Sequence, residues 1–165
     1  MADRKLFDME TYVRQIRTGP CFICEMIAGR SNGNHIIYQD ESVIAFLNKY
    51  PVLYGYALVA PVKHKEQATG DFTLDEYLAL QRRVYQVAQA VRRSVETERV
   101  YLLSLGSQQG NRHVHWHIAP LPHGVPFGEQ QLEALSIRHG ILDIPDSEMM
   151  ALAERIRHNL NLAGE

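Results

Sequence analysis

Short apolar runs, and stretches that alternate between apolar and polar residues, predict a β-sheet. The run at residues 54–61 is nearly continuous, which is typical of a strand in the middle of a sheet. The first two predicted strands are joined by the acidic turn Gln39-Asp40-Glu41. The five predicted strands cover residues 35–38, 42–47, 54–61, 99–106 and 113–120.

Apolar residues spaced three or four apart predict helices, the longest of which starts at Thr73 and runs to about Val95. Thr73 and Glu76 form a capping box, in which a hydroxyl and a carboxylate satisfy free backbone amides at the helix start. Another pattern ends at Gly19-Pro20, and we expect that helix to pack on the domain without acting in the chemistry. The shorter predicted helices cover residues 1–18, 129–138 and 146–160.

Length and composition indicate one globular domain. The chain has 165 residues, of which 45% are hydrophobic and 22% are charged, so it is large enough for a core. A formal net charge of −2 provides no basic surface for duplex nucleic acid. No apolar run approaches the roughly 20 residues that a membrane span needs. Residues 1–5 are charged and no apolar segment of a signal peptide follows them, so we expect a cytoplasmic protein.

Three histidines, His113, His115 and His117, alternate with large apolar residues. Successive side chains of a strand leave opposite faces, so the histidines should share one face, about 6.5–7 Å apart. The apolar residues between them, including Trp116, should then enter a core from the other face. One strand histidine usually has a purely structural role, whereas three in strict alternation indicate binding. Such a row can hold a metal, bind an anion, or present one imidazole as a nucleophile.

The only two cysteines, Cys21 and Cys24, are spaced so that their thiolates can bind one tetrahedral metal ion. They are too few and too close for a disulfide scaffold. A redox pair of the thioredoxin type needs a strand before it, but Gly19-Pro20 breaks the chain there. A closed zinc site needs two more ligands, most naturally histidines. Two reduced structural cysteines remain the alternative.

The segment His-Val-His-Trp-His-Ile-Ala at residues 113–119 resembles the pattern of the histidine triad (HIT) family of nucleotide hydrolases and transferases. Supporting matches lie upstream in the family's order, and the resemblance covers roughly residues 20–121. It implies an α+β fold, in which a long helix packs on an antiparallel sheet, and a homodimer. We therefore expect residues 1–165 to form a single HIT domain with a helical C-terminal extension at about 122–165. The supporting matches are residues 21–24, 43–48, 54–61 and 63–64.

The resemblance also implies a chemistry for each histidine. His115 would attack the α-phosphorus of a purine nucleotide conjugate and form a covalent nucleotidyl-histidine intermediate. His117 would hydrogen-bond the phosphate and stabilise its developing charge. His113 would orient its neighbours or bind zinc. Among the departures from the family pattern, Ser104 replaces the usual Asn, and Tyr56 stands where many members have His.

The ligand positions follow from the same resemblance. In members that keep the Cys pair, the remaining two ligands correspond here to His64 and His113. The expected structural zinc site is therefore Cys21, Cys24, His64 and His113.

The nucleotide pocket follows from the resemblance in the same way. Phe46 matches an apolar residue beside the base, and Asn48 matches a position that is usually Asp and binds the ribose hydroxyls. Asn can donate and accept, so ribose binding survives in principle. The loop at residues 107–112 is about two residues shorter than is common, and Gln109 and Asn111 are its best candidate phosphate donors.

Three functions are compatible with these residues. The first is a nucleotide hydrolase of the phosphoramidase or dinucleoside polyphosphate type, which releases a nucleoside monophosphate. The second is a nucleotide-binding module whose altered phosphate loop has lost turnover. The third is a metalloprotein that uses all three triad histidines as ligands. A trapped His115 adduct, nucleotide binding without turnover, and metal loss on triad mutation distinguish them.

Overall fold

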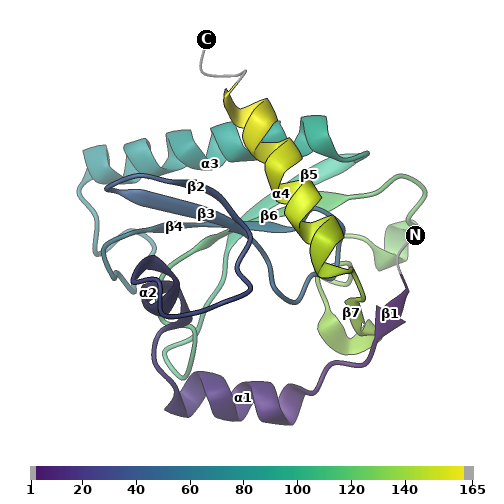
Figure 1. The fold of residues 1–165 in the computed structure, drawn as a ribbon, viewed down its shortest axis with the longest axis horizontal. Coiled ribbons are helices and arrows are strands. Elements are labelled where there is room, and N and C mark those ends of the chain that lie inside the picture. The colour runs from purple at the N-terminus through teal and green to yellow at the C-terminus, as the bar shows by residue number, and fades with distance from the viewer. Residues whose placement is uncertain (1–2, 162–165) are drawn as a thin grey trace.

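The computed structural model describes residues 3–161, and it has the α+β architecture that the sequence predicts (Figure 1). The central sheet is antiparallel throughout, with the strand order β2-β3-β4-β6-β5. The triad segment therefore feeds an inner strand, β6, that is paired on both sides. The five strands are β2 (Ile36–Gln39), β3 (Val43–Leu47), β4 (Ala57–Pro61), β5 (Arg99–Ser104) and β6 (Trp116–Leu121).

One face of the sheet is covered by α3 (Leu74–Ser94), against which α4 (Asp146–Asn161) packs (Figure 1). Val114, Trp116 and Ile118 all lie in the core between this face and the helices, which confirms the predicted alternation. Trp116 anchors that core, because its ring meets two further aromatic rings edge-on at centroid distances of 6.1 Å. Within residues 3–161, no helix combines the length and apolar character needed to cross a bilayer.

The opposite face of the sheet carries the N-terminal segments (Figure 1). The short helix α2 (Phe22–Ile27) buries Ile23 and Met26 there. The preceding helix α1 (Met9–Thr18) buries no residue completely. A separate two-stranded sheet, formed by β1 (Arg4–Lys5) and β7 (Ile141–Leu142), holds the start of the described chain. This face is more open than the other, and the candidate site lies on it.

The long helix begins with the predicted capping box. The Glu76 backbone N–H donates to Thr73 Oγ1 at 3.2 Å, and the Thr73 N–H donates to Glu76 Oε2 at 2.8 Å. Most of the predicted apolar stripe is buried, but Leu74 in the first turn is largely exposed. The C-terminal helix α4 also confirms the pattern predicted for residues 146–160.

The strand predicted at residues 54–61 begins only at Ala57. Gly55 has a φ of +84°, in the left-handed region that glycine adopts without strain. The Tyr56 N–H then donates to the Leu53 carbonyl at 3.2 Å, which makes a turn instead of a ladder.

The strand predicted at residues 113–120 begins at Trp116. The Val114 N–H donates to the Lys65 carbonyl at 2.7 Å, outside the sheet. The register of β4 with β6 ends at Val59 and Trp116, and its continuation would place Pro61 opposite Val114. Proline has no N–H with which to extend the ladder. The first two triad histidines therefore precede the strand.

Two helix predictions are wrong: one predicted helix is shorter than expected, and the other does not form. The helix predicted at residues 1–18 starts at Met9, with Asp8 as its N-cap, and residues 1–2 lie outside the described chain. The helix predicted at residues 129–138 is absent, and two single 3₁₀ turns flank that stretch. Gln131, with a φ of +57°, interrupts helical backbone inside it.

Asp40 organises the turn between β2 and β3. Its Oδ1 accepts hydrogen bonds from the backbone N–H groups of Ser42 and Val43, both at 2.8 Å, and the Tyr38 hydroxyl donates to Oδ2 at 2.6 Å. Burial acts to raise the pKa of Asp40, but these hydrogen bonds outweigh it and lower the pKa to about 2.

We expect Asp40→Ala to lower the free energy of unfolding at pH 7 by about 2 kcal/mol, because the partly buried Val43 N–H and Tyr38 hydroxyl lose their acceptor. The folded-state pKa lies below the unfolded value of about 3.9, so this stabilisation is present above pH 4 and is lost toward pH 2. Urea unfolding of wild type and variant at pH 7 and pH 2 measures it. An equal difference at both pH values would contradict the assignment.

Candidate metal cluster and histidine site

A cavity of about 830 Å³ opens on the N-terminal face of the sheet. Its walls come from α1, Cys21 and part of α2, the end of β3, the segment before the triad and the triad itself. Of the predicted ligand-binding residues, Phe46, Asn48 and Asn111 line it. A volume near the upper end of the usual range for small-molecule sites, about 300–1,000 Å³, accommodates a ligand of nucleotide size or larger.

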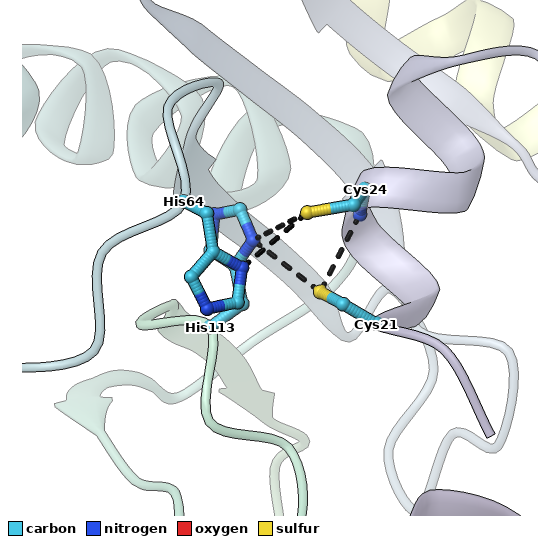
Figure 2. A group of neighbouring side chains, drawn as sticks. All are labelled: Cys21, Cys24, His64 and His113. Carbon is cyan, nitrogen blue, oxygen red and sulfur yellow. Dashed lines mark hydrogen bonds between the residues drawn. The ribbon is translucent and has the colours of Figure 1, made fainter.

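Cys21, Cys24, His64 and His113 gather at one side of this cavity (Figure 2). The sulfur of Cys21 lies 3.5 Å from Nδ1 of His113, and the sulfur of Cys24 lies 3.4 Å from Nδ1 of His64. The four ligand atoms all lie within 4.8 Å of one another. Cys21 caps the start of α2, where its sulfur accepts from the Cys24 N–H at 3.5 Å, so the helix turn itself brings the two sulfurs together.

The two histidines of the cluster come from segments 49 positions apart (64 and 113), and the backbone holds those segments together. The hydrogen bond from Val114 to the Lys65 carbonyl aligns them, and the His64 and His113 rings meet at a centroid distance of 4.7 Å. The buried ammonium of Lys65 is held in turn by Glu76 Oε2 at 2.9 Å. The capped start of α3 therefore helps to fix the position of His64, which directly precedes Lys65.

The imidazoles present the correct nitrogen to the sulfurs. His113 donates from Nε2 to the Pro61 carbonyl at 2.8 Å, and His64 Nε2 lies 3.1 Å from Glu66 Oε1, so both Nδ1 atoms face the cluster. Burial lowers the pKa of His113 to about 4, which keeps this ring neutral. Burial, followed by the neighbouring Cys21, raises the pKa of Cys24 to about 11. Two thiols and two oriented imidazoles form the donor set of a closed, tetrahedral zinc site, and a divalent cation would stabilise both thiolates.

His115 is buried next to the cluster and is held as one tautomer. Its Nδ1–H donates to the carbonyl oxygen of His113 at 2.7 Å, so Nε2 carries the free lone pair. Burial lowers the pKa of His115 and keeps the ring neutral at pH 7. Ser104 fixes the backbone by donating its hydroxyl to the His115 carbonyl at 2.8 Å. A neutral imidazole with an exposed lone pair in a cavity is a competent nucleophile.

His117 is the only triad histidine within β6. Its Nδ1 lies 2.9 Å from the hydroxyl of Tyr56, and burial raises the pKa of that phenol to about 12, so the hydroxyl keeps its proton. Burial, followed by the neighbouring His115, lowers the pKa of His117 to about 4. Within residues 3–161, Nε2 of His117 has no hydrogen-bond partner. With Tyr56 donating to Nδ1, the ring proton of His117 lies on Nε2, which is itself buried.

The HIT domain model matches residues 30–124 of the chain. The chain belongs to the HIT family. An uncharacterized HIT-like protein of Saccharolobus solfataricus is 31% identical over 103 residues, covering 61% of this chain and 73% of that protein. Membership implies chemistry of the nucleotide hydrolase or transferase type and a nucleotide ligand.

Solved HIT structures have the same fold. That of a hypothetical histidine triad nucleotide-binding protein from Sulfolobus tokodaii gives a TM-score of 0.70 at 25% identity, over 86% of this chain and 93% of that one. A zinc-bound histidine triad family protein from Mycobacterium smegmatis gives 0.68 at 21% identity, over 87% and 96%.

Within this HIT domain, the triad does not form the evenly spaced row that was predicted. His113 turns into the metal cluster, whereas the rings of His115 and His117 lie side by side, with their centroids 4.9 Å apart. The reason is the early end of the ladder before Trp116, which frees the two preceding histidines from strand geometry. All three still line the cavity, as predicted.

The predicted phosphate donors are already engaged. Gln109 lies outside the cavity lining and accepts a hydrogen bond from Arg17 at 2.9 Å. Asn111, with a φ of +56°, donates to the Tyr12 hydroxyl at 2.8 Å. Asn48 Oδ1 accepts from the Tyr50 N–H at 2.9 Å, which leaves its amide nitrogen for a ligand. Phosphate binding by Gln109 and Asn111 therefore stays a prediction.

Sequence reasoning missed two contributors to the site. The first is α1, which supplies Tyr12, Ile16 and Arg17 to the cavity wall although we expected it only to pack. The second is Phe22, whose ring meets Phe46 edge-on at a centroid distance of 6.2 Å and approaches His115 at 6.3 Å. Its position between Cys21 and Cys24 could have indicated that Phe22 lies near the site, because two residues that bind one metal ion also fix the residues between them in the sequence.

We expect Cys21→Ser with Cys24→Ser to abolish zinc binding and to lower the melting temperature by roughly 5–10 °C, because a metal cross-link between α2 and the triad segment is lost. Metal analysis and calorimetry measure both effects. Chelation should lower the melting temperature of wild type to that of the variant and leave the variant unchanged. Equal melting temperatures, with no zinc in the wild type, would contradict the assignment.

Proposed function

We propose that this HIT protein is a nucleotide hydrolase or transferase that acts at the α-phosphate of a purine nucleotide conjugate through a nucleotidyl-His115 intermediate. The substrate is a phosphoramidate or a dinucleoside polyphosphate, and the product is a nucleoside monophosphate. The observation that carries this proposal is the His115 ring, which is neutral, buried beside the cavity, and has its Nδ1 proton committed to the His113 carbonyl.

The geometry supports a two-step mechanism. Nε2 of His115 attacks the α-phosphorus, and the bond to the leaving group breaks as the phosphorus–nitrogen bond forms. Nε2–H of His117, which has no partner within residues 3–161, hydrogen-bonds a non-bridging phosphate oxygen and stabilises its charge. Water then attacks the same phosphorus, and the electron pair of the phosphorus–nitrogen bond returns to His115.

The nucleoside would lie against the aromatic wall of the cavity. Phe22 presents apolar ring surface beside His115, and the buried Phe46 packs edge-on behind it, as an apolar wall for a purine requires. Asn48, at the end of β3, offers its amide nitrogen to the ribose hydroxyls.

We further propose that the cluster of Cys21, Cys24, His64 and His113 holds a structural zinc ion, in line with the zinc-bound relative from Mycobacterium smegmatis. Zinc would cross-link three segments of the chain and keep the thiolates deprotonated. The chemistry at phosphorus remains with the two histidines outside this cluster.

A homodimer is also proposed, in which β5 and α3 meet their counterparts. The strand order leaves β5 at the edge of the sheet. Leu102 and Leu105 near this edge, and Leu78 and Tyr85 on α3, are each more than half exposed. Apolar side chains on an unpaired edge favour association, and the sedimentation coefficient distinguishes the monomer from the dimer.

One observation favours a second candidate, a nucleotide-binding module with little turnover. Both predicted donors of the shortened phosphate loop, Gln109 and Asn111, are tied to α1 by their side chains. Nucleotide binding without an adduct or product would identify this case.

We expect intact-protein mass spectrometry during turnover to show a transient adenylyl adduct on wild type, with an adenosine phosphoramidate or diadenosine tetraphosphate as substrate. His115→Ala should retain the fold and lose both adduct and turnover, by at least about a thousandfold, because no other nucleophile faces the phosphorus. His158→Ala, a change of an exposed histidine on α4, is the matched control and should behave as wild type. Normal turnover by His115→Ala would contradict the mechanism.

A further inference from the structure

The helix α1 lies outside the matched HIT domain, which begins at residue 30, and nevertheless forms one wall of the cavity. Tyr12, Ile16 and Arg17 are the α1 residues of this wall that also contact other segments. None of the α1 side chains is completely buried, so those that line the cavity are available to a ligand.

Three contacts seat α1 on the segment that precedes the triad. Arg17 Nη2 donates to Gln109 at 2.9 Å, and the Tyr12 hydroxyl accepts from Asn111 at 2.8 Å. Between them, Ile16 lies against Gly110 so closely that an added Cβ there would stand 2.9 Å from the Ile16 side chain. Because this segment leads directly into His113, Arg17 is placed toward the triad end of the cavity.

The acidic side chains of the cavity wall are already paired. Glu25 accepts two hydrogen bonds from Arg30, at 2.6 and 3.0 Å. Glu66 accepts from His64 at 3.1 Å, beside the metal cluster. Glu66 therefore offsets at most one positive charge of the wall.

The basic side chains of the wall are Arg17, Lys49 and Arg112. Within residues 3–161, none of the three has an acidic partner, and the only side-chain acceptor of Arg17 is a neutral amide. The cavity therefore carries excess positive charge, which raises its affinity for an anionic ligand. Lys49 lies near the ring of Tyr50, at the end of β3. Arg112 is the last residue of the segment before the triad, and Arg17 contacts the same segment through Gln109.

We infer that Arg17, together with Arg112, forms an anion subsite for the leaving group, and that Arg17 determines a preference for substrates with a negative charge beyond the scissile phosphate. This inference rests on the proposed nucleotidyl transfer. One nitrogen of Arg17 binds Gln109, and the other donors of the guanidinium can bind phosphate or carboxylate oxygens in a bidentate manner. The subsite recognises an anionic group on the leaving group of the substrate. This group can be the phosphates of a polyphosphate or the carboxylate of an amino-acid leaving group.

The experiment compares nucleotides that differ only beyond the α-phosphate. Dissociation constants of AMP and ATP are measured by calorimetry for wild type, Arg17→Ala and Arg17→Lys. We expect Arg17→Ala to weaken the binding of ATP about tenfold and that of AMP less than twofold. A tenfold loss is at the lower end of what a charge-assisted hydrogen bond contributes. Arg17→Lys should recover part of the ATP affinity, and high salt should reduce the difference, because the site is open to solvent.

Turnover identifies the source of the anion. One substrate pair is an amino-acid adenosine phosphoramidate with a free carboxylate and the same compound as its carboxamide; the other substrate is diadenosine tetraphosphate. If one negative charge is enough for recognition by the subsite, wild type should turn over the carboxylate faster than the carboxamide. A preference confined to diadenosine tetraphosphate would assign the subsite to polyphosphate. Arg17→Ala should remove whichever preference wild type shows.

A control variant separates the charge of Arg17 from that of the helix as a whole. Arg14→Ala removes a positive charge from the same helix, but Arg14 does not line the cavity, so the ATP to AMP affinity ratio should stay at the wild-type value.

An unchanged ratio in Arg17→Ala, or the same loss in Arg14→Ala, would overturn the inference even if His115 forms its adduct. Failure of wild type to bind either nucleotide or to form the adduct would instead overturn the proposed function.

Discussion

The hydrogen bond from Nδ1 of His115 to the carbonyl oxygen of His113 joins the two halves of the site. His113 supplies its Nδ1 to the cysteines and its Nε2–H to Pro61, so its position is fixed from two sides. The same residue then fixes the tautomer of His115 through its backbone. A residue of the metal cluster and the proposed nucleophile, two positions apart, are thereby held as one rigid unit, and in the proposed mechanism the lone pair needs no reorganisation before attack.

The fold separates stability from chemistry. On one face of the sheet, α3 packs a continuous apolar core against Trp116 and its neighbours, and α4 extends that core. On the other face, the sheet presents Phe46, Leu58 and the triad histidines to a cavity closed by α1. Because β6 alternates, Trp116 and Ile118 enter this core while His117 faces the cavity. The chain thus supports buried, partly unpaired polar groups at the site by dense packing behind them.

The sequence was most informative where one physical rule decides the structure. Strict alternation placed Trp116 in the core, Thr73 and Glu76 formed their capping box, and the Cys pair met His64 and His113, whose pairing the family resemblance implied. It was least informative where tertiary contacts decide. A proline facing Val114 ended the strand early, and docking against the segment before the triad turned α1 into a cavity wall. Such partners are distant in sequence, so no local pattern records them.

Nitrogen-15 NMR of the histidine rings tests the central claim most directly, because it reports which ring nitrogen carries the proton. At pH 7 the account predicts neutral rings, with His115 protonated on Nδ1 and His113 protonated on Nε2. Zinc removal should broaden or shift the His115 signals, since its acceptor is the backbone of a cluster residue. A His115 ring protonated on Nε2, or charged at pH 7, would contradict the account, because no lone pair would then face the phosphorus.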